Sequence, residues 1–340
     1  MTRLKKKAYA AAGVDIALGN LVKRGLQEKV KTTFGPEVLG RIGAFGGFFR
    51  LDLQGIKDPV LVSSIDGVGT KLKIAISLGK HESIAQDLVN HCINDIAVTG
   101  AKPLFFLDYI GAERLEPPVF NKLISGFTKA CQAGRCALIG GETAQMPDMY
   151  HRGEYDLAGC IVGIVDREKI IDGSRIVPSD VLIGLPSNGL HTNGYSLARK
   201  VLLSEMRLDL GQKVEGLSKT LGEELLRIHR NYQPVLAEIP AGRIKGSAHI
   251  TGGGLIDNLP RILPATCDAL IDTSSWKVPP IFRLIQRGGG IAFEEMLEVF
   301  NMGIGLVLVV AKRNAAEVIE RTAGKIIGQI TPGSRKVLVT

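Results

Sequence analysis

Apolar runs of strand length alternate with segments of helical periodicity along the chain, a pattern typical of α/β proteins. In the first half, we expect strands at 48–53, 60–62, 104–110, 136–139 and 155–165. The second, third and fourth of these runs lack polar alternation, which predicts buried strands. We expect helices directly after Lys71, over 82–100 and over 117–134. The turn-forming stretch 54–58 would join the first two strands as a hairpin.

The second half continues this pattern, with strands predicted at 180–185, 269–272, 303–310 and 325–330. Helices are predicted from Tyr195 onward and over 217–238 and 314–322. A charged, turn-rich stretch at 166–178 separates the halves, so we divide the chain into residues 1–167 and 168–340. A chain of 340 residues is long enough for two domains that each bury a core.

The most informative polar segment is 63–73, SSIDGVGTKLK, which follows the strand at 60–62. It places five polar or flexible residues at one strand-to-helix corner: Asp66, Gly67, Gly69, Thr70 and Lys71. A carboxylate, bare N–H groups, a hydroxyl and an ammonium suit magnesium and phosphate oxygens, although the spacing is not that of a Walker loop. A plain turn is the alternative, with Asp66 capping the helix and Lys71 on the surface.

The predicted helix over 82–100 carries a second polar pattern. Asp87, His91 and Asp95 recur at every fourth position, with Asn90 and Asn94 beside them. A solvated helix face more often carries Lys and Glu, so these shorter side chains favour a surface that faces a ligand. An ion pair between Asp87 and His91 along the helix is the alternative.

Three glycine-rich loops extend this picture. They contain Gly140, Gly141 and Glu142 after the strand at 136–139, His191 and Asn193 within 187–194, and Gly252 and Gly253 within 251–254. Strands that end in glycine-rich, acidic loops commonly form a ligand crevice. Asp66, Asp95 and Glu142 together would offer oxygen ligands to Mg²⁺. His81, His151 and His229 show no such grouping, and we expect them to be structural or on the surface.

Composition and charge narrow the functional class. The net charge is +8, but the only dense basic run is 5–7 and aromatic residues make up 5% of the chain, which disfavours nucleic acid. The charge fits an anionic small molecule or serves solubility alone. The five cysteines are odd in number and lack C-x-x-C spacing, which predicts buried, reduced thiols. No signal peptide and no apolar run of membrane-spanning length is visible, so we expect a cytoplasmic protein without membrane contact.

Together these motifs resemble the phosphoribosylformylglycinamidine cyclo-ligases, also called aminoimidazole ribonucleotide synthetases. The matching segments are GVD (13–15), SSIDGVGTKLK (63–73), D-x4-G-A-x-P (95–103), LFFLDY (104–109), ALIGGETA (137–144), GLHTNGYSL (189–197), HITGGG (249–254) and FNMGIG (300–305). They follow the family's order across nearly the whole chain. The chain departs from the family at Gln145, where an acidic residue is more common, at Ile65, and within 43–47.

The resemblance implies an α/β fold of two domains, each a mixed β-sheet with flanking helices, and a homodimer in which the N-terminal sheets pair. It implies ATP-dependent ring closure of formylglycinamidine ribonucleotide to 5-aminoimidazole ribonucleotide, ADP and phosphate in purine biosynthesis. The N-terminal domain would bind ATP and Mg²⁺, and the C-terminal domain would complete the cleft.

The resemblance also assigns roles to residues. The implied metal ligands are Asp15, Asp66, Asp95 and Glu142, and the implied catalytic residues are Asp66, Lys71, Asp95 and His191. Nucleotide or substrate contacts are implied for Gly67, Gly69, Thr70, Asn94, Gly140, Gly141, Asn193, Gly252 and Gly253.

Two other functions remain open. The D-x4-G-A-x-P pattern is shared by a wider superfamily of ATP-using enzymes, so the chain fits a kinase that acts on another small molecule. A non-enzymatic nucleotide-binding module is the second alternative. The binding module is disfavoured because simple nucleotide binding does not need three acidic residues together with a lysine. The chain carries all four: Asp66, Asp95, Glu142 and Lys71. Selenophosphate synthetase would need a cysteine or selenocysteine near the N-terminus, whereas the first cysteine here is Cys92.

Overall fold

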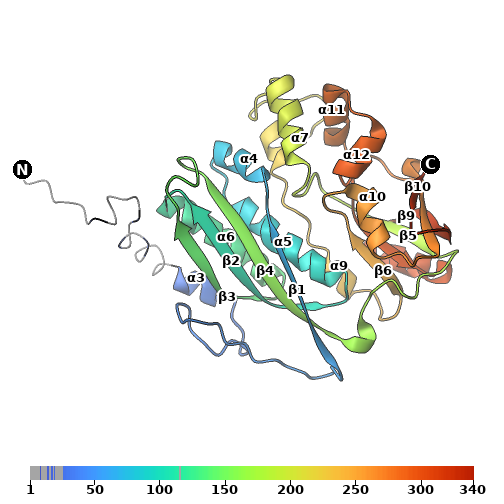
Figure 1. Ribbon diagram of the computed structural model, residues 1–340, viewed down its shortest axis with the longest axis horizontal. Coiled ribbons are helices and arrows are strands. Elements are labelled where there is room, and N and C mark those ends of the chain that lie inside the picture. The colour runs from blue at the N-terminus through green and yellow to red at the C-terminus, as the bar shows by residue number, and fades with distance from the viewer. Residues whose placement is uncertain (1–7, 9–13, 15–16, 18, 20–25, 115) are drawn as a thin grey trace, which may run out of the picture.

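The computed structural model describes residues 8, 14, 17, 19, 26–114 and 116–340. Two α/β units lie side by side, each built on a mixed β-sheet with flanking helices (Figure 1), which confirms the predicted fold class. The five cysteines are free thiols and four of them are buried, as expected. Within the described ranges, no helix combines the length and the apolar character needed to cross a membrane.

The N-terminal unit has four strands in the order β1-β4-β2-β3. Their bounds are β1 Pro59–Gly67, β2 Lys102–Ala112, β3 Ala137–Gln145 and β4 Tyr155–Asp166. Helices α5 (Glu82–Ala97) and α6 (Pro117–Ala133) cover one face of this sheet, and the short α3 (Gln27–Lys31) packs beside α6 and β3. Helix α5 buries the apolar stripe that the sequence predicts, because Ile84, Leu88 and Cys92 are fully buried against the sheet.

Strand β1 lies at the edge of its sheet, and one of its faces is open. Leu61 and Ile65 are 59% and 72% exposed, so the prediction of a buried strand at 60–62 is wrong. The reason is that helices cover only one face of this sheet. The strand predicted at 48–53 is reduced to an isolated bridge between Val38 and Phe49, and β1 pairs with β4 instead of forming the predicted hairpin.

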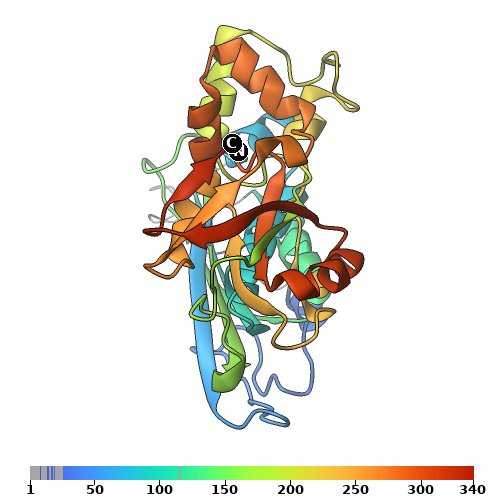
Figure 2. The ribbon, with the colours of Figure 1, turned by 90° about the vertical axis from the view of Figure 1, so that its right-hand side faces the viewer.

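The C-terminal unit has six strands in the order β10-β7-β9-β5-β8-β6 and faces the viewer in Figure 2. Their bounds are β5 Val181–Pro186, β6 Ile244–His249, β7 Cys267–Ile271, β8 Ile304–Val310, β9 Lys325–Pro332 and β10 Val337–Val339. Strands β5, β7, β8 and β9 correspond to the four predicted strands. Strands β6 and β10 were not predicted, and β6 ends at His249, two residues before Thr251.

Helices pack on both faces of the C-terminal sheet, because alternate residues of its interior strand β8 belong to two apolar clusters. One cluster includes α10 (Gly254–Asn258), α11 (Pro280–Gly289) and α12 (Phe293–Val299), and the other includes α13 (Ala315–Thr322) and packs beside α9 (Gln233–Ala237). The remaining helices are α4 Lys71–Leu78, α7 Tyr195–Arg199, the π-helical η2 Lys200–Glu205, α8 Leu221–Leu225, and the 3₁₀ turns η1 Arg167–Lys169, η3 Leu259–Arg261, η4 Thr273–Ser275 and η5 Lys312–Asn314. The sequence did not predict α11 or α12.

The predicted helix over 217–238 is interrupted by an irregular segment, 226–232, that lies along α5. Amide side chains of α5 bond its peptide groups and so replace the hydrogen bonds of a helix. The bonds, each 2.8 Å long, run from Asn90 Nδ2 to His229 O, from Asn94 Nδ2 to Arg230 O, and from Tyr232 N to Asn94 Oδ1. The long helix prediction is wrong because these contacts outweigh local periodicity. Helix α5 therefore has the N-terminal sheet on one side and the C-terminal unit on the other (Figure 1).

Candidate active site

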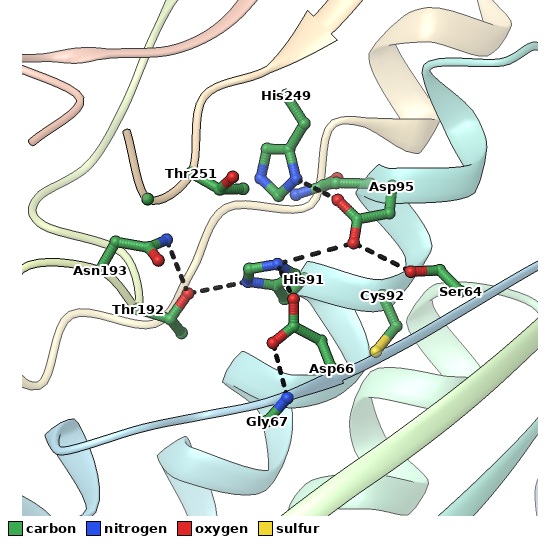
Figure 3. A network of polar contacts seen from close by, with 12 residues as sticks. Ser64, Asp66, Gly67, His91, Cys92, Asp95, Thr192, Asn193, His249 and Thr251 are labelled. Atoms are coloured by element: carbon green, nitrogen blue, oxygen red, sulfur yellow. Dashed lines mark hydrogen bonds and ion pairs between the residues drawn. The ribbon is translucent and has the colours of Figure 1, made fainter. Parts of the chain in front are cut away.

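His91, on α5, lies where the two units meet and connects several segments of the chain (Figure 3). Its Nε2 lies 2.7 Å from Asp66 Oδ2 on β1, and its Nδ1 lies 2.8 Å from Thr192 Oγ1 in the loop after β5. Asp95 Oδ2, one turn further along α5, lies 3.6 Å from the same Nε2. The alternative of an ion pair with Asp87 along the helix is not formed, because Asp87 pairs with Lys71.

Asp95 joins α5 to the C-terminal sheet. His249, the last residue of β6, places Nδ1 2.8 Å from Asp95 Oδ1, and Ser64 of β1 donates its hydroxyl to Asp95 Oδ2 at 3.1 Å. Asp66 is held as well, because its Oδ1 accepts the N–H of Gly67 at 2.6 Å. The side chains of Asp66 and Asp95 remain 39% and 25% exposed. Two oriented, partly exposed carboxylates therefore lie on either side of one imidazole nitrogen (Figure 3).

The charges in this acidic centre, formed by Asp66, His91 and Asp95, depend on one another. Burial disfavours protonation of His91, but the two carboxylates outweigh burial and raise the pKa of His91. Burial also opposes ionisation of Asp95, yet its hydrogen bond with His249 and the nearby His91 lower the pKa of Asp95. The centre thus combines an ionised Asp95 with a histidine that gains a proton readily.

We expect the pKa of His91 to lie above its ordinary value and to fall in Asp66→Asn, which removes the charge of its bonded carboxylate. Because the folded-state pKa is raised, the protonated ring stabilises the fold below the unfolded-state pKa. That contribution is lost as the pH rises through the folded-state pKa. NMR titration of the imidazole nitrogens measures both values, with the exposed His151 as an assignment reference. A pKa of His91 that is identical in the two proteins would contradict this interpretation.

A layer of buried histidines lies behind the acidic centre. His229 Nε2 lies 2.9 Å from His249 Nε2, and the ring of His191 stacks on that of His229 with centroids 4.0 Å apart. Burial, together with repulsion from neighbouring imidazoles, lowers the pKa of His191 and His229 well below the usual value. Burial also lowers the pKa of His249, although its bond to Asp95 opposes the shift. These three rings therefore form an uncharged wall at neutral pH.

A cavity of about 350 Å³ opens beside the acidic centre. Asp66, His91 and Asp95 line it from the N-terminal unit, and His249 and Thr251 line it from the C-terminal unit. Of the walls that the sequence predicted for a cleft, Asp66 and Asp95 line this cavity, whereas residues 140–142 and His191 do not. The cavity places a small molecule in reach of both carboxylates.

The chemistry of the carboxylates fits a magnesium ion. Mg²⁺ prefers oxygen ligands and often takes one or two carboxylates together with substrate phosphates. Asp66 and Asp95 are oriented by hydrogen bonds, are partly exposed, and face the cavity. Ligand atoms of His91, Asp95 and His249 lie within 4.8 Å of one another, so the surroundings are compact enough for a cation.

Glu142 does not join the acidic centre. Asp66 on β1 pairs with Gly159 on β4, and Gly159 pairs on its other side with Asp108 on β2. Asp108 in turn pairs with Gly141 on β3, so three strand spacings of about 4.8 Å, about 14 Å in all, separate Asp66 from Gly141. Glu142 is the next residue, is exposed, and belongs to the opposite face of the sheet. Ligands of one Mg²⁺ lie about 4 Å apart or less, so the predicted shared site is wrong within one chain.

Lys71 is fully buried, and the prediction that it neutralises phosphate is wrong in this structure. Its Nζ lies 2.7 Å from Asp87 Oδ2 and donates to the carbonyls of His191 at 3.0 Å and Arg227 at 2.8 Å. Burial lowers the pKa of Lys71, and the charge of Asp87 partly offsets this. Lys71 instead joins α4 to two segments of the C-terminal unit.

Two other residues with predicted ligand contacts are also buried inside the protein. Asn94 is fully buried and uses both ends of its amide to hold the backbone of 230–232, so its predicted ligand contact is wrong. His191 is 1% exposed and does not line the cavity, so a direct contact with substrate does not fit its position. Among the described residues, neither ring nitrogen of His191 has a hydrogen-bond partner.

The remaining predicted residues fall into separate places. Gly67, Gly69 and Thr70 lead from β1 into α4, and Thr70 Oγ1 lies 3.0 Å from Ser196 Oγ. Asn193 lies next to Gly252, because a Cβ at that glycine would stand 3.3 Å from Asn193 Oδ1. Gly253 precedes α10 with a φ of 91°, a conformation that favours glycine.

Gly140 and Gly141 lie in the middle of β3 rather than after it, because this strand continues to Gln145. They line a second cavity of about 400 Å³, together with the glycine-rich segment 41–47. Asp15, an implied metal ligand, lies outside the described residues.

Sequence reasoning missed three polar residues that shape the acidic centre: Thr192, His229 and His249. His249 occupies the matched HITGGG segment, and its place at a strand end, like that of Asp66, was an unused signal. His229 was expected to be structural or on the surface without a grouping, but it lies in the histidine layer. Its segment looked helical, so no local signal identified it. His81, in contrast, bonds the hydroxyl of Tyr155 at 2.8 Å as a structural residue.

Known proteins match the chain over nearly its whole length. Family models for the AIR synthase related protein match residues 52–165 with the N-terminal domain and 177–340 with the C-terminal domain. The chain is 50% identical to the phosphoribosylformylglycinamidine cyclo-ligase of Syntrophotalea carbinolica over an alignment of 342 positions. The alignment covers 99% of this chain and 98% of that protein. The chain belongs to the cyclo-ligase family. The predicted resemblance is confirmed.

Solved structures with low sequence identity share the fold. Thiamine-monophosphate kinase from Stenotrophomonas maltophilia K279a superposes with a TM-score of 0.64 at 18% identity and covers 96% of each chain. The hydrogenase maturation protein HypE in complex with ATP gives a TM-score of 0.66 at 16% identity and covers 96% of this chain and 91% of its own. At these identities the likeness concerns the fold alone.

Proposed function

We propose that the protein is an ATP-dependent cyclo-ligase that converts formylglycinamidine ribonucleotide to 5-aminoimidazole ribonucleotide, ADP and phosphate. The observation that carries this function is the pair of oriented carboxylates, Asp66 and Asp95, at a cavity between two units of a cyclo-ligase family chain. The relative at 50% identity bears the cyclo-ligase name. A cytoplasmic location is consistent with the five free cysteines.

The reaction needs positioning and charge neutralisation more than covalent chemistry by the protein. The γ-phosphoryl group of ATP passes to the formyl oxygen of the substrate, which turns that oxygen into a leaving group. A substrate nitrogen then attacks the formyl carbon, the new C–N bond closes the ring, and phosphate departs with the oxygen.

Asp66 and Asp95 would hold a magnesium ion, which neutralises phosphate charge when bound. His91 holds a proton at Nε2 between these carboxylates and so keeps both oriented toward the cavity. Thr192 fixes the other ring nitrogen of His91 from the C-terminal unit. We assign the binding of ATP and Mg²⁺ to residues 1–167 and completion of the cleft to residues 168–340.

The test is incubation of the full chain with ATP, Mg²⁺ and formylglycinamidine ribonucleotide, followed by detection of the aminoimidazole product and of ADP. We expect the two products in equal amounts. A kinase of the same superfamily would give ADP and a phosphorylated substrate without the imidazole. The absence of imidazole under these conditions would overturn the proposed function.

We also propose a homodimer that buries the open face of the N-terminal sheet. This face carries exposed Leu61 and Ile65, and the partly exposed Phe105, Leu107 and Val162 lie on neighbouring strands of the same face. An apolar sheet face without a covering helix is a common site of protein association.

We expect Ile65→Glu to shift the protein from dimer to monomer, because it places a charge on this apolar face at its most exposed apolar side chain. Analytical ultracentrifugation measures the change. Leu338→Glu is the control, since Leu338 is an exposed leucine on β10 of the other sheet. A wild-type protein that sediments as a monomer, or an Ile65→Glu variant that remains dimeric, would contradict this arrangement.

A further inference from the structure

The cavity beside the acidic centre is lined by residues of both units. Its lining residues are Asp66, His91, Asp95, Val98, Thr99, Ile171, Ser247, Ala248, His249, Thr251, Asn258, Arg261 and Ile262. Acidic and histidine side chains come from β1, α5 and the end of β6, whereas Arg261 comes from η3. Of the described residues that line the cavity, only Arg261 carries a permanent positive charge. The cavity therefore has an acidic centre and a separate basic residue.

The guanidinium of Arg261 has no hydrogen-bond or ion-pair partner among the described residues. By contrast, Arg227 pairs with Glu224 and Arg243 pairs with Glu317. Arg261 is exposed at the cavity, where all five of its N–H groups remain available. A guanidinium of this kind is suited to bidentate bonding of a phosphate group.

The segment that carries Arg261 is held firmly by Asn258, which is 2% exposed. Its Nδ2 donates to the carbonyls of Gly254 at 2.7 Å and Gly252 at 3.1 Å, and its Oδ1 accepts the hydroxyl of Thr251 at 3.2 Å. This network ties the start of η3 to the glycine-rich loop after β6. The arginine therefore extends from a fixed backbone and not from a free loop.

Ser247 provides a second, independent sign of a ligand. It is 3% exposed and lines the cavity, yet its hydroxyl has no hydrogen-bond partner within the described part of the chain. A buried hydroxyl without a partner costs free energy unless a ligand or water completes it.

The position of Ser247 relative to the acidic centre follows from its place on β6. Ser247 and His249 are two residues apart on β6 and therefore project from the same side of the strand, about 7 Å apart. His249 bonds Asp95 of the acidic centre, so Ser247 lies one step further from the carboxylates.

We propose that Arg261 and Ser247 bind the 5-phosphate of the substrate's ribose, with the formylglycinamidine end directed toward Asp66 and Asp95. This inference rests on the proposed function for the identity of the substrate. The orientation follows from the proposed reaction: the formyl oxygen must reach the γ-phosphoryl group of an ATP whose magnesium Asp66 and Asp95 would hold, so the anionic ribose phosphate is directed toward the positive charge of Arg261. The cavity also has an apolar lining, Val98, Ile171 and Ala248, which would contact the sugar.

The first test compares the ribonucleotide with the corresponding ribonucleoside, which lacks the phosphate. We expect Arg261→Ala to raise KM for the ribonucleotide roughly 10- to 100-fold, the range expected for loss of a charge-assisted phosphate contact. KM for ATP should not change, and turnover of the ribonucleoside should be equally poor in both proteins. Arg261→Lys should recover part of the loss, and Ser247→Ala should raise KM by a smaller factor.

The matched control is Arg283→Ala, which removes an exposed arginine of α11 that does not line this cavity. Its KM should equal that of the wild type. An Arg261→Ala variant with unchanged KM, or with the same proportional loss for ribonucleotide and ribonucleoside, would overturn the assignment.

A second measurement separates this inference from the proposed reaction. Calorimetry with ribose 5-phosphate and no ATP should detect binding to the wild type and to Arg283→Ala, and a loss of at least roughly tenfold in Arg261→Ala. This result supports the phosphate site even if the wild type forms no imidazole. Failure of the wild type to bind ribose 5-phosphate, or equal binding by Arg261→Ala, would overturn the site even if the reaction is confirmed.

Discussion

Asp66→Asn is expected to lower the rate of ATP-dependent ring closure by roughly 100- to 1000-fold, the usual cost of removing one preorganised electrostatic group. The substitution keeps the size of the side chain and the oxygen that accepts from Gly67 N. It removes the negative charge that faces both His91 and the cavity. The loss should therefore appear in kcat, while the melting temperature stays close to that of the wild type because Asp66 is partly exposed.

The control for this variant is Asp58→Asn, which removes an exposed carboxylate just before β1. It should leave kcat unchanged. The fall in the pKa of His91 described above gives an independent readout in Asp66→Asn, since it depends on the charge and not on catalysis. If Asp66→Asn keeps near-normal turnover, the assignment of the acidic centre to magnesium and ATP is wrong.

Lys71→Met is expected to cost roughly 3–5 kcal/mol of folding stability, the typical loss when one partner of a buried ion pair is removed. The ammonium has no exposed surface and bonds Asp87 and two carbonyls of the C-terminal unit. Without it, the carboxylate of Asp87 stays buried with no counter-charge. Burial already raises the pKa of Asp87 to about 6, despite the opposing effect of Lys71. Urea denaturation followed by fluorescence and circular dichroism measures the change.

Two further variants sharpen this test. Lys73→Met removes a neighbouring lysine whose ion pair with Glu154 is exposed, and should change stability by about 1 kcal/mol or less. The double variant Lys71→Met/Asp87→Asn removes both buried charges and keeps an oxygen that can accept from His229 N, so it should regain much of the loss. A Lys71→Met protein that unfolds at the wild-type urea concentration would show that the ion pair does not hold the units together.

Local pattern was sufficient for most elements of the fold. Helix α5 was predicted because its apolar residues recur with helical spacing, and strands β2, β4 and β8 because their runs are apolar and of strand length. These signals depend on neighbours in the chain. They failed at 217–238, where side chains of α5 bond the backbone and replace a helix. They also failed for β1, whose exposed face depends on which helices cover its sheet.

The candidate site, like the fold, was predicted only in part from the sequence. Asp66 and Asp95 were identified from residue type and spacing, and the structure brings both to one histidine. Glu142 and Lys71 carried equally suitable chemistry in sequence. Strand order placed Glu142 three strands away from Asp66, and domain docking buried Lys71.

The sequence by itself determined the family, the two α/β halves and the two carboxylates of the acidic centre, because these depend on motifs and on short-range periodicity. The tertiary structure alone decided which polar side chains meet. It joined His249 to Asp95, placed His229 in the histidine layer, and brought Arg261 to the same cavity as the carboxylates. The physical reason is that a contact such as that of Asp95 with His249 joins residues 154 positions apart in the chain, whose approach is set by sheet order and by the packing of one unit on the other.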